Sequence, residues 1–304
     1  MSDATTTSAA SKVRFSPRRV WTLALATMTQ LIRMKILAFL VVFCLLAAGA
    51  GFAFSVINPE QQLNLLKSVT LGALQIFSIV IGVVSTALLL PKDMEDRTLY
   101  TILSKPVPRF DYLLGKLLGV LMLIGGGLIV MDAVLSLILW MRQSLLFEDA
   151  VARMRLEKMD SPEAVAQVRE IVARQGLTWN LHWAVWAIFL KATVVTTVAL
   201  LLSSIASSTL FTIVITFCVT IIGHGEALIR EFFFRPYLSS SMARAASFFL
   251  AAIVPDLAQF DIVDSVVNGE IVPWAAVYDM TGIAALYVTV YLFVTHLLFV
   301  EKEL

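Results

Sequence analysis

Residues 183–227 read WAVWAIFLKATVVTTVALLL, then SSIASST, then LFTIVITFCVTIIGHGEA. A membrane span needs about 20 mostly apolar residues to cross about 30 Å of hydrocarbon. The run 183–202 meets this length, and the run 210–227 is only slightly shorter. Because the connector between them is short and rich in serine, the stretch predicts two membrane helices joined by a tight hairpin.

The composition of the whole chain agrees with a membrane protein. Of its 304 residues, 59% belong to the apolar set and 15% are charged, whereas about 45–50% apolar residues is usual in soluble domains. The net charge of +1 indicates no nucleic-acid partner. Both cysteines, Cys44 and Cys218, lie in apolar runs, so neither a disulfide framework nor a metal-binding cysteine pattern is present. The high apolar content and the low charged content exclude a soluble enzyme.

Four more apolar runs are long enough to cross a membrane; they lie at 36–57, 69–90, 112–141 and 274–300. The predicted fold is therefore an all-α membrane protein with six transmembrane helices. The stretch 245–254 is apolar for only about ten residues before Pro255 and Asp256, which favours a re-entrant or interfacial helix. The first run starts late and is too long for the core of a signal peptide, so we expect it to stay attached.

Basic residues are concentrated in two segments and predict the orientation of the chain. Residues 1–35 contain six basic residues and one acidic residue: Lys12, Arg14, Arg18, Arg19, Arg33 and Lys35 against Asp3. Residues 91–116 add five more: Lys92, Arg97, Lys105, Arg109 and Lys116. By the positive-inside rule both segments are cytoplasmic. We expect a multi-pass protein of a cell membrane, the bacterial inner membrane, with both termini in the cytoplasm.

The N-terminal segment contains the signal for an amphipathic helix before the first span. Ser16 and Pro17 suit the cap and first position of a helix. Apolar residues then recur at helical spacing: Val20, Leu23, Ala24, Met28, Leu31 and Ile32. This pattern favours an interfacial helix on the cytoplasmic leaflet. The alternative is an inward extension of the first span.

The connection 142–180 is predicted to form a helical hairpin outside the membrane, on the side opposite the cytoplasm. Its first helix is expected at 146–159. Its second begins at Ser161 and Pro162 and ends at Gly176. The chain then divides into 1–35 (tail and amphipathic helix), 36–141 (spans one to three, with a cytoplasmic helix at about 92–110), 142–180 (hairpin), 181–227 (spans four and five), 228–273 (outer or re-entrant segment) and 274–304 (span six and a short cytoplasmic tail).

The cytoplasmic segment 91–116 reads PKDMEDRTLYTILSKPVPRFDYLLGK. Asp93, Glu95 and Asp96 favour the positive end of a helix. Leu99, Ile102 and Leu103 form an apolar stripe, and two prolines stop the helix. A compact helix of this kind outside the membrane is suited to binding another protein. An ordinary solvated loop is the alternative.

This segment resembles the permeases of type-2 ABC transporters (ABC-2-type permeases), in which an acidic residue, Thr-Leu, Leu-Ser-x-Pro, an arginine and Gly-Lys recur between the second and third spans. The matching positions are Glu95, Thr98, Leu99, Leu103, Ser104, Pro106, Arg109, Gly115 and Lys116. Arg97 departs from the pattern, since many members have glycine there. The amphipathic helix and the six-span layout are also similar, though less specific.

The resemblance implies the transmembrane subunit of an ATP-driven exporter. Such a chain pairs with a second permease, as a homodimer or heterodimer, and docks a cytosolic ABC ATPase through its coupling helix. The docking residues would be Glu95, Thr98, Leu99, Ile102, Leu103, Ser104, Pro106 and Arg109, with Arg109 set against the ATPase or lipid headgroups. Because no G-x-x-x-x-G-K-[ST] motif occurs in the chain, ATP and Mg²⁺ are expected in the partner ATPase. No cofactor or metal is expected in this chain.

Two other functions remain open. An ABC-type mechanotransmitter would act on external proteins through the hairpin 142–180 without moving a solute. A membrane scaffold or enzyme unrelated to ABC transporters is the other alternative. The enzyme finds less support, since the sequence has no H-E-x-x-H motif, no paired-aspartate motif and no serine and histidine at matched depth. The transported substrate is not identified by any motif.

Asp132 and Lys191 are charged residues well inside predicted spans. Asp132 precedes the outer end of span three, and Lys191 follows the outer start of span four, so both are expected about 12 Å below the outer surface. We predict an ion pair between them, with a transport-path role or a proton relay as alternatives. His224 and Glu226 are two positions apart and do not share a helix face, so they predict no metal site. Gly115 with Gly119, and Gly125 to Gly127, predict close approach of neighbouring helices.

Overall fold

The computed structural model describes residues 15–33, 42, 45, 49, 62–95, 108–156, 161–206, 208–233 and 254–301. Within these residues the fold is helical, without strands, as the sequence predicted. The elements are α1 (Pro17–Arg33), α3 (Gln62–Glu95), α5 (Arg109–Leu156), α6 (Pro162–Gln175), α7 (Asn180–Ile205), α8 (Thr209–Phe233), the 3-10 turn η2 (Ala258–Phe260), α10 (Val263–Val267) and α11 (Trp274–Glu301).

Four of the described helices are long and apolar enough to cross a membrane: α3, α5, α7 and α11. The apolar part of α8, Thr209–Gly225, is shorter. The chain is therefore a membrane-associated helical protein. The predicted first span, 36–57, lies outside the described residues apart from Val42, Leu45 and Gly49, which are helical. The arrangement of six spans stays a prediction.

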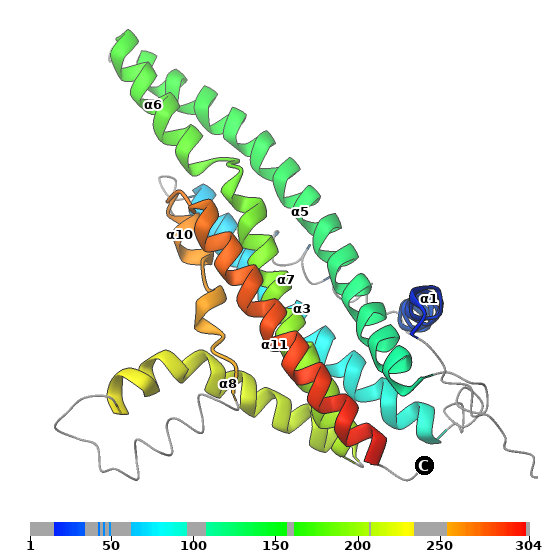
Figure 1. Cartoon of the computed structure of the whole chain (residues 1–304). Helices are drawn as coiled ribbons and strands as arrows, with labels where there is room; N and C mark the ends of the chain where they lie inside the picture. The colour runs from blue at the N-terminus through cyan, green and yellow to red at the C-terminus, as the bar shows by residue number, and fades with distance from the viewer. Residues whose placement is uncertain are drawn as a thin grey trace, which may run out of the picture.

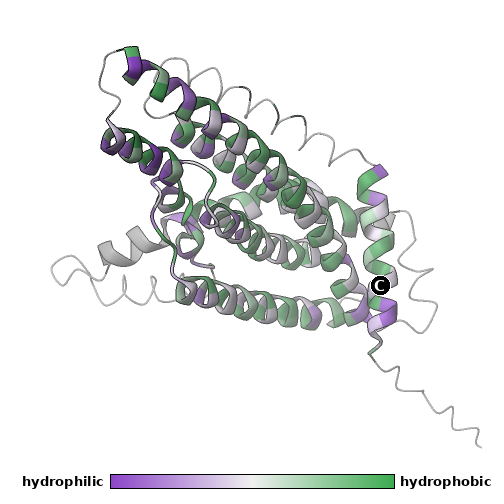
Figure 2. Cartoon of the chain, turned by 90° about the horizontal axis from the view of Figure 1, so that it is seen from above, coloured by the Kyte–Doolittle hydropathy of each residue, from purple (hydrophilic) through white to green (hydrophobic). Residues whose placement is uncertain are grey.

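The long helices form a slanted bundle, and two helices cross it (Figure 1). The axes of α3, α5, α7 and α11 slant alike, with α5 running opposite to the other three, whereas α1 is seen end-on beside α5 and α8 lies across the lower part. Figure 2 shows that the long helices are mostly hydrophobic along their length. The core is built around α7, which packs against α3 and α11.

α7 is buried along nearly its whole length, including several threonines. Thr193 donates its hydroxyl to the carbonyl of Phe189 at 2.8 Å, and Thr197 donates to the carbonyl of Thr193 at 2.8 Å. Because these hydroxyls find acceptors one turn back on their own helix, they need no partner on a neighbouring helix. The central helix can therefore carry polar residues inside an apolar bundle.

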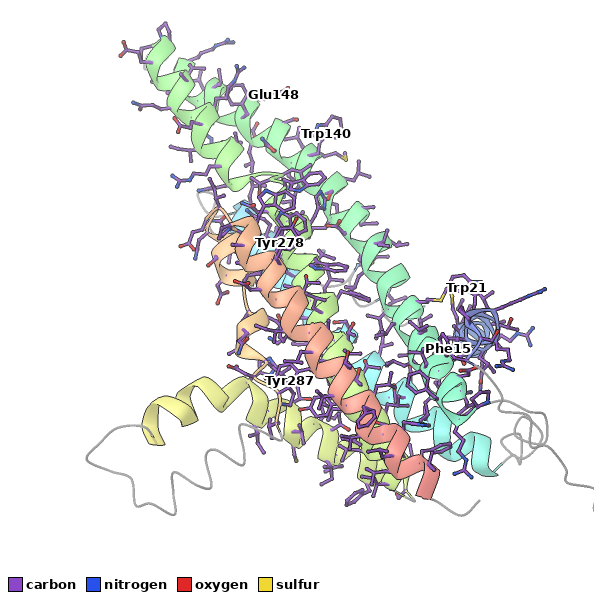
Figure 3. All side chains as sticks on the ribbon, viewed as in Figure 1. Phe15, Trp21, Trp140, Glu148, Tyr278 and Tyr287 are labelled. Atoms are coloured by element: carbon purple, nitrogen blue, oxygen red, sulfur yellow. The ribbon has the colours of Figure 1, made fainter. Side chains whose placement is uncertain are left out.

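α5 is one helix of 48 residues and continues fifteen residues beyond Met141, where the third span was expected to end. Residues 146–156, expected in the first helix of the hairpin, are helical and pack against α6, but they continue α5 and do not start a new helix. The physical reason is the absence of glycine and proline between Arg142 and Leu156. Trp140 and Glu148 lie toward the C-terminal end of α5, near its hairpin with α6 (Figure 3).

α6 begins at the predicted residues. The Ser161 side chain accepts a hydrogen bond from the Ala164 amide at 3.2 Å, and Pro162 occupies the first turn. At the other end, the Gly176 amide donates to the Val172 carbonyl at 2.8 Å, and the Gln143 side chain of α5 accepts from the Leu177 amide at 3.1 Å. The last contact ties the end of α6 to α5.

The described residues before α11 begin at Val254 and lie against α8. The Leu257 amide donates to the Gly223 carbonyl of α8 at 3.0 Å. A Cβ at Gly223 would lie 2.6 Å from the Pro255 carbonyl oxygen, so the backbones touch where no side chain fits. The predicted re-entrant helix, 245–254, lies outside the described residues except for Val254.

Candidate functional site

The predicted coupling segment connects the end of α3 to the start of α5. Residues 92–95, which were expected to begin the coupling helix, form the last turn of α3, with Pro91 inside that helix. Residues 96–107 lie outside the described part of the chain. The docking roles of Thr98, Leu99, Ile102, Leu103, Ser104 and Pro106 therefore stay predictions, as does that of Glu95, whose backbone alone is described.

Arg109 joins the start of α5 to the end of α11. Its Nη1 atom donates to the carbonyl oxygens of Phe299 at 2.8 Å and Val300 at 2.7 Å. The last carbonyl groups of a helix receive no hydrogen bond from an amide of the same helix, and a positive charge is favourable at this end of the helix dipole. Arg109 thus caps α11. Its expected contact with an ATPase or lipid headgroups stays a prediction, and the contact with α11, 190 residues away, was missed from the sequence.

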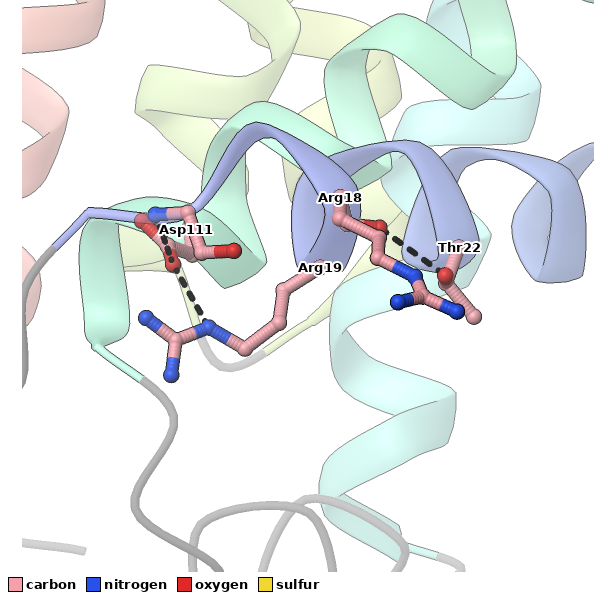
Figure 4. Close-up of polar contacts among 5 residues, drawn as sticks. Arg18, Arg19, Thr22 and Asp111 are labelled. Atoms are coloured by element: carbon pink, nitrogen blue, oxygen red, sulfur yellow. Dashed lines mark hydrogen bonds and ion pairs between the residues drawn. The ribbon is translucent and has the colours of Figure 1, made fainter.

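Asp111, in the first turn of α5, holds the start of α1 (Figure 4). Its Oδ2 atom accepts from the Ser16 amide at 3.3 Å and from Arg19 Nε at 3.2 Å. The Asp111 carboxylate is fully buried. One side chain of α5 therefore supplies both a hydrogen-bond acceptor and a counter-charge at the first turn of α1, where a negative charge is favourable. The sequence showed only an acidic residue between two aromatic ones.

Aromatic rings close the same three helix ends. Phe15 packs against Phe110 with 6.2 Å between ring centroids, and Phe110 meets His296 edge-on at 5.4 Å. Tyr112 stacks on Phe299 at 6.2 Å. We call this cluster the inner junction; it comprises Phe15, Arg19, Arg109, Phe110, Asp111, Tyr112, His296 and Phe299. It joins α1, α5 and α11 where the coupling segment enters α5.

Gly115 and Gly119 let α1 lie directly on α5. A Cβ at Gly115 would come within 2.6 Å of Leu23 Cβ, and one at Gly119 within 2.6 Å of Thr27 Cβ and 2.7 Å of the Ala24 carbonyl oxygen. The close helix approach predicted for this pair of glycines is therefore confirmed, with α1 as the partner helix. At Gly126, in the second predicted group, an added Cβ would meet no atom within 4 Å, so close approach there is not confirmed. Gly115 is one of the positions that carry the family resemblance.

α1 carries a second apolar face that the described residues do not cover. Val20, Ala24, Thr27 and Leu31 are buried toward the bundle, whereas Trp21, Leu25 and Ile32 are exposed. Phe15 and Trp21 are seen at this helix in Figure 3. One face packed on protein and another apolar face left open is a pattern typical of a helix lying at a membrane surface.

The predicted ion pair between Asp132 and Lys191 is wrong. Asp132 Oδ2 lies 2.7 Å from His182 Nδ1, and Lys191 Nζ lies 3.5 Å from Asp261 Oδ2. Asp132 is level with the first turn of α7, so Lys191 lies nine residues further along α7, about 13 Å away at 1.5 Å per residue. The sequence prediction assumed that the ends of the two apolar runs lie at the same depth. They do not, so the two charges were wrongly placed at one level.

His224 has a local partner on its own helix. Its Nδ1 atom lies 2.8 Å from the Thr220 carbonyl oxygen. Among the described residues, no group of three or more histidine, cysteine, aspartate or glutamate side chains is placed to hold a metal ion.

Neither protein-family models nor curated proteins give a match to this chain. The relation to type-2 ABC permeases therefore stays a proposal, resting on the quoted segment and on the inner junction.

Proposed function

We propose that this chain is the transmembrane permease subunit of an ATP-driven exporter of the ABC-2 type, coupled to a separate cytosolic ATPase. The observation that carries the proposal is the sequence pattern from Glu95 to Lys116. Its second half supplies residues 109–112 of the inner junction and the glycine at which α1 packs on α5. The chain has no phosphate-binding loop of its own, so a partner must supply ATP hydrolysis. A second permease subunit would complete the transporter.

The inner junction suggests how a displacement of the coupling segment would spread. The segment enters α5 at Arg109, which caps α11, and Asp111 follows two residues later and holds α1. A push on residues 96–107 would therefore act on three helices at once. Packed elements of this kind tend to move as units. The exposed apolar stripe of α1 would slide along the membrane surface as it moves.

The test is recovery of ATPase activity with the chain. The tagged protein is crosslinked in its native membrane, purified, and assayed for Mg²⁺-dependent ATP hydrolysis. We expect activity with the wild type and its loss in Glu95→Lys combined with Leu99→Asp. The matched control is the charge reversal Glu163→Lys on α6, which should keep the activity. Inactive wild-type material, or full activity in the double variant, would contradict the proposal.

A second function, mechanotransmission to external proteins, is favoured by the continuity of α5. This single helix runs for 48 residues, about 72 Å at 1.5 Å per residue, from the inner junction to the hairpin with α6. No residue of α6 is buried, so the hairpin has free surface. Replacement of residues 144–176 by a short flexible linker separates the two functions. If the protein is an exporter, ATP-dependent solute efflux should survive this replacement. If it is a mechanotransmitter, its effect on external proteins should be lost.

A further inference from the structure

The ion pair of Lys191 and Asp261 lies near the middle of the bundle. Lys191 is eleven residues into α7, about 16 Å from its start at 1.5 Å per residue, and its side chain is 1% exposed. The separation of 3.5 Å between Nζ and Asp261 Oδ2 is long for a hydrogen bond, and Nζ has no hydrogen-bond partner among the described residues. The two groups are therefore held together by charge.

An exposed apolar residue lies at the same level. Trp186 Nε1 of α7 donates to Thr281 Oγ1 of α11 at 3.1 Å, and both helices run in the same direction. Five residues further along each helix, Lys191 is level with Leu286. Leu286 is 63% exposed. Such a leucine suits hydrocarbon, so it provides a reference for the lipid-facing side of the bundle at this depth.

The backbone around Asp261 is irregular at this depth. Only the 3-10 turn η2 interrupts the non-helical stretch from Val254 to Ile262. The Asp256 carboxylate holds the turn by accepting from the Ala258 amide at 3.2 Å and from Gln259 Nε2 at 2.9 Å, and the Asp256 amide donates to the hydroxyl of Tyr287 at 3.2 Å (Figure 3). Non-helical backbone at membrane depth is tolerated only where protein buries it or water reaches it.

Part of this stretch is buried by protein and part of it is exposed. Residues 254–257 are buried, whereas Gln259 and Asp261 are exposed, the Asp261 side chain by 45%. A carboxylate facing hydrocarbon near the centre of a membrane is costly. Lys191 lies on the buried side of Asp261, so it balances the charge of the carboxylate there and does not cover its exposed side. Two further polar residues are exposed after this stretch: Asp264 in α10 and Asn268 directly after α10.

We propose that the exposed side of Gln259, Asp261 and Asp264 lines a water-filled path, open to the outer side, along which a hydrophilic solute passes. The inference rests on the proposed function and narrows its substrate class. Because the buried amine of Lys191 lies behind Asp261, the side that faces water carries carboxylates. The path therefore favours solutes with ammonium or other hydrogen-bond-donating groups over anions, and it does not suit acyl chains.

The test is thiol accessibility in intact cells. Cys44 and Cys218 are first replaced by serine, and Gln259→Cys is the primary variant because it keeps the ion pair. Asp261→Cys is the second variant. We expect Gln259→Cys to react with a membrane-impermeant thiosulfonate added outside. The matched control, Leu286→Cys, should react only after unfolding in SDS, because a thiol in hydrocarbon does not ionise.

A cysteine at position 259 that reacts only after SDS, like the one at 286, would overturn the proposal, since lipid or a second copy then covers the segment. A cationic reagent should also react several-fold faster than an anionic one at position 259, and Asp264→Asn should reduce the ratio. Equal rates would overturn the assigned charge preference. The labelling needs no ATPase, so its failure leaves the coupling proposal intact, and loss of the coupling proposal leaves the labelling result valid.

Discussion

Arg19 Nε and Asp111 Oδ2 lie 3.2 Å apart and join the first turns of α1 and α5. The Asp111 side chain is 1% exposed and that of Arg19 is 34% exposed. The pair is therefore buried on the side of the acid and open on the side of the base. Removing the base strands a buried carboxylate, whereas a surface pair would lose little.

Arg19→Gln should loosen α1 from the bundle. The Asp111 carboxylate would keep the Ser16 amide but lose its counter-charge, at a cost of about 1–3 kcal/mol. Thermal unfolding in detergent and limited proteolysis near residue 19 measure this. Arg18→Gln is the control, because the Arg18 side chain is exposed and the hydrogen bond of Thr22 goes to its backbone carbonyl. Equal behaviour of the two variants would show that the ion pair does not hold α1.

Gly119→Ala should destabilise the protein by about 1–3 kcal/mol, since its Cβ would overlap Thr27 and the Ala24 carbonyl. Gly126→Ala, on the same helix, has no atom within 4 Å of the added carbon. That control should be neutral or stabilising by about 0.5–1 kcal/mol, because alanine favours a helix over glycine. Unfolding temperatures of both variants check the contrast, and a neutral Gly119→Ala would argue against close packing of α1 on α5.

Lys191→Met should lower the yield of folded protein because Asp261 loses its counter-ion. Adding Asp261→Asn should restore part of the yield, since the double variant leaves no unpaired charge. Asp132→Asn should add to Lys191→Met without rescue, because Asp132 pairs with His182. Size-exclusion profiles of the single and double variants in detergent measure these effects. Rescue of Lys191→Met by Asp132→Asn instead would restore the ion pair predicted from the sequence.

Single cysteines test the orientation predicted from the basic residues. In a chain without Cys44 and Cys218, cysteines at Ser161 and Asn268 should react with an impermeant reagent on intact cells. Cysteines at Ser104 and Glu303 should react only after the membrane is opened. Labelling of the Ser104 position from outside would reverse the assigned sides of the membrane.

Local features were predictable because their causes are local. The starts of α1 and α6 lie at the predicted Pro17 and Pro162, where a fixed proline φ acts within one turn, and the Ser161 side chain caps α6. The apolar runs predicted α3, α5, α7 and α11 because each needs only its own length and composition. The close approach at Gly115 and Gly119 was also predictable, since two small residues one turn apart leave space whatever fills it.

The amino-acid sequence by itself determined an all-helical, membrane-associated chain with a charged segment between two long helices. Only the tertiary structure decided which groups meet. Arg109 caps α11, 190 residues away, and Lys191 pairs with Asp261 and not with Asp132. These choices depend on the tilt and offset of whole helices, where an error of nine residues moves a charge by about 13 Å. Apolar periodicity defines the face of a helix, and it leaves the position along the helix axis undetermined.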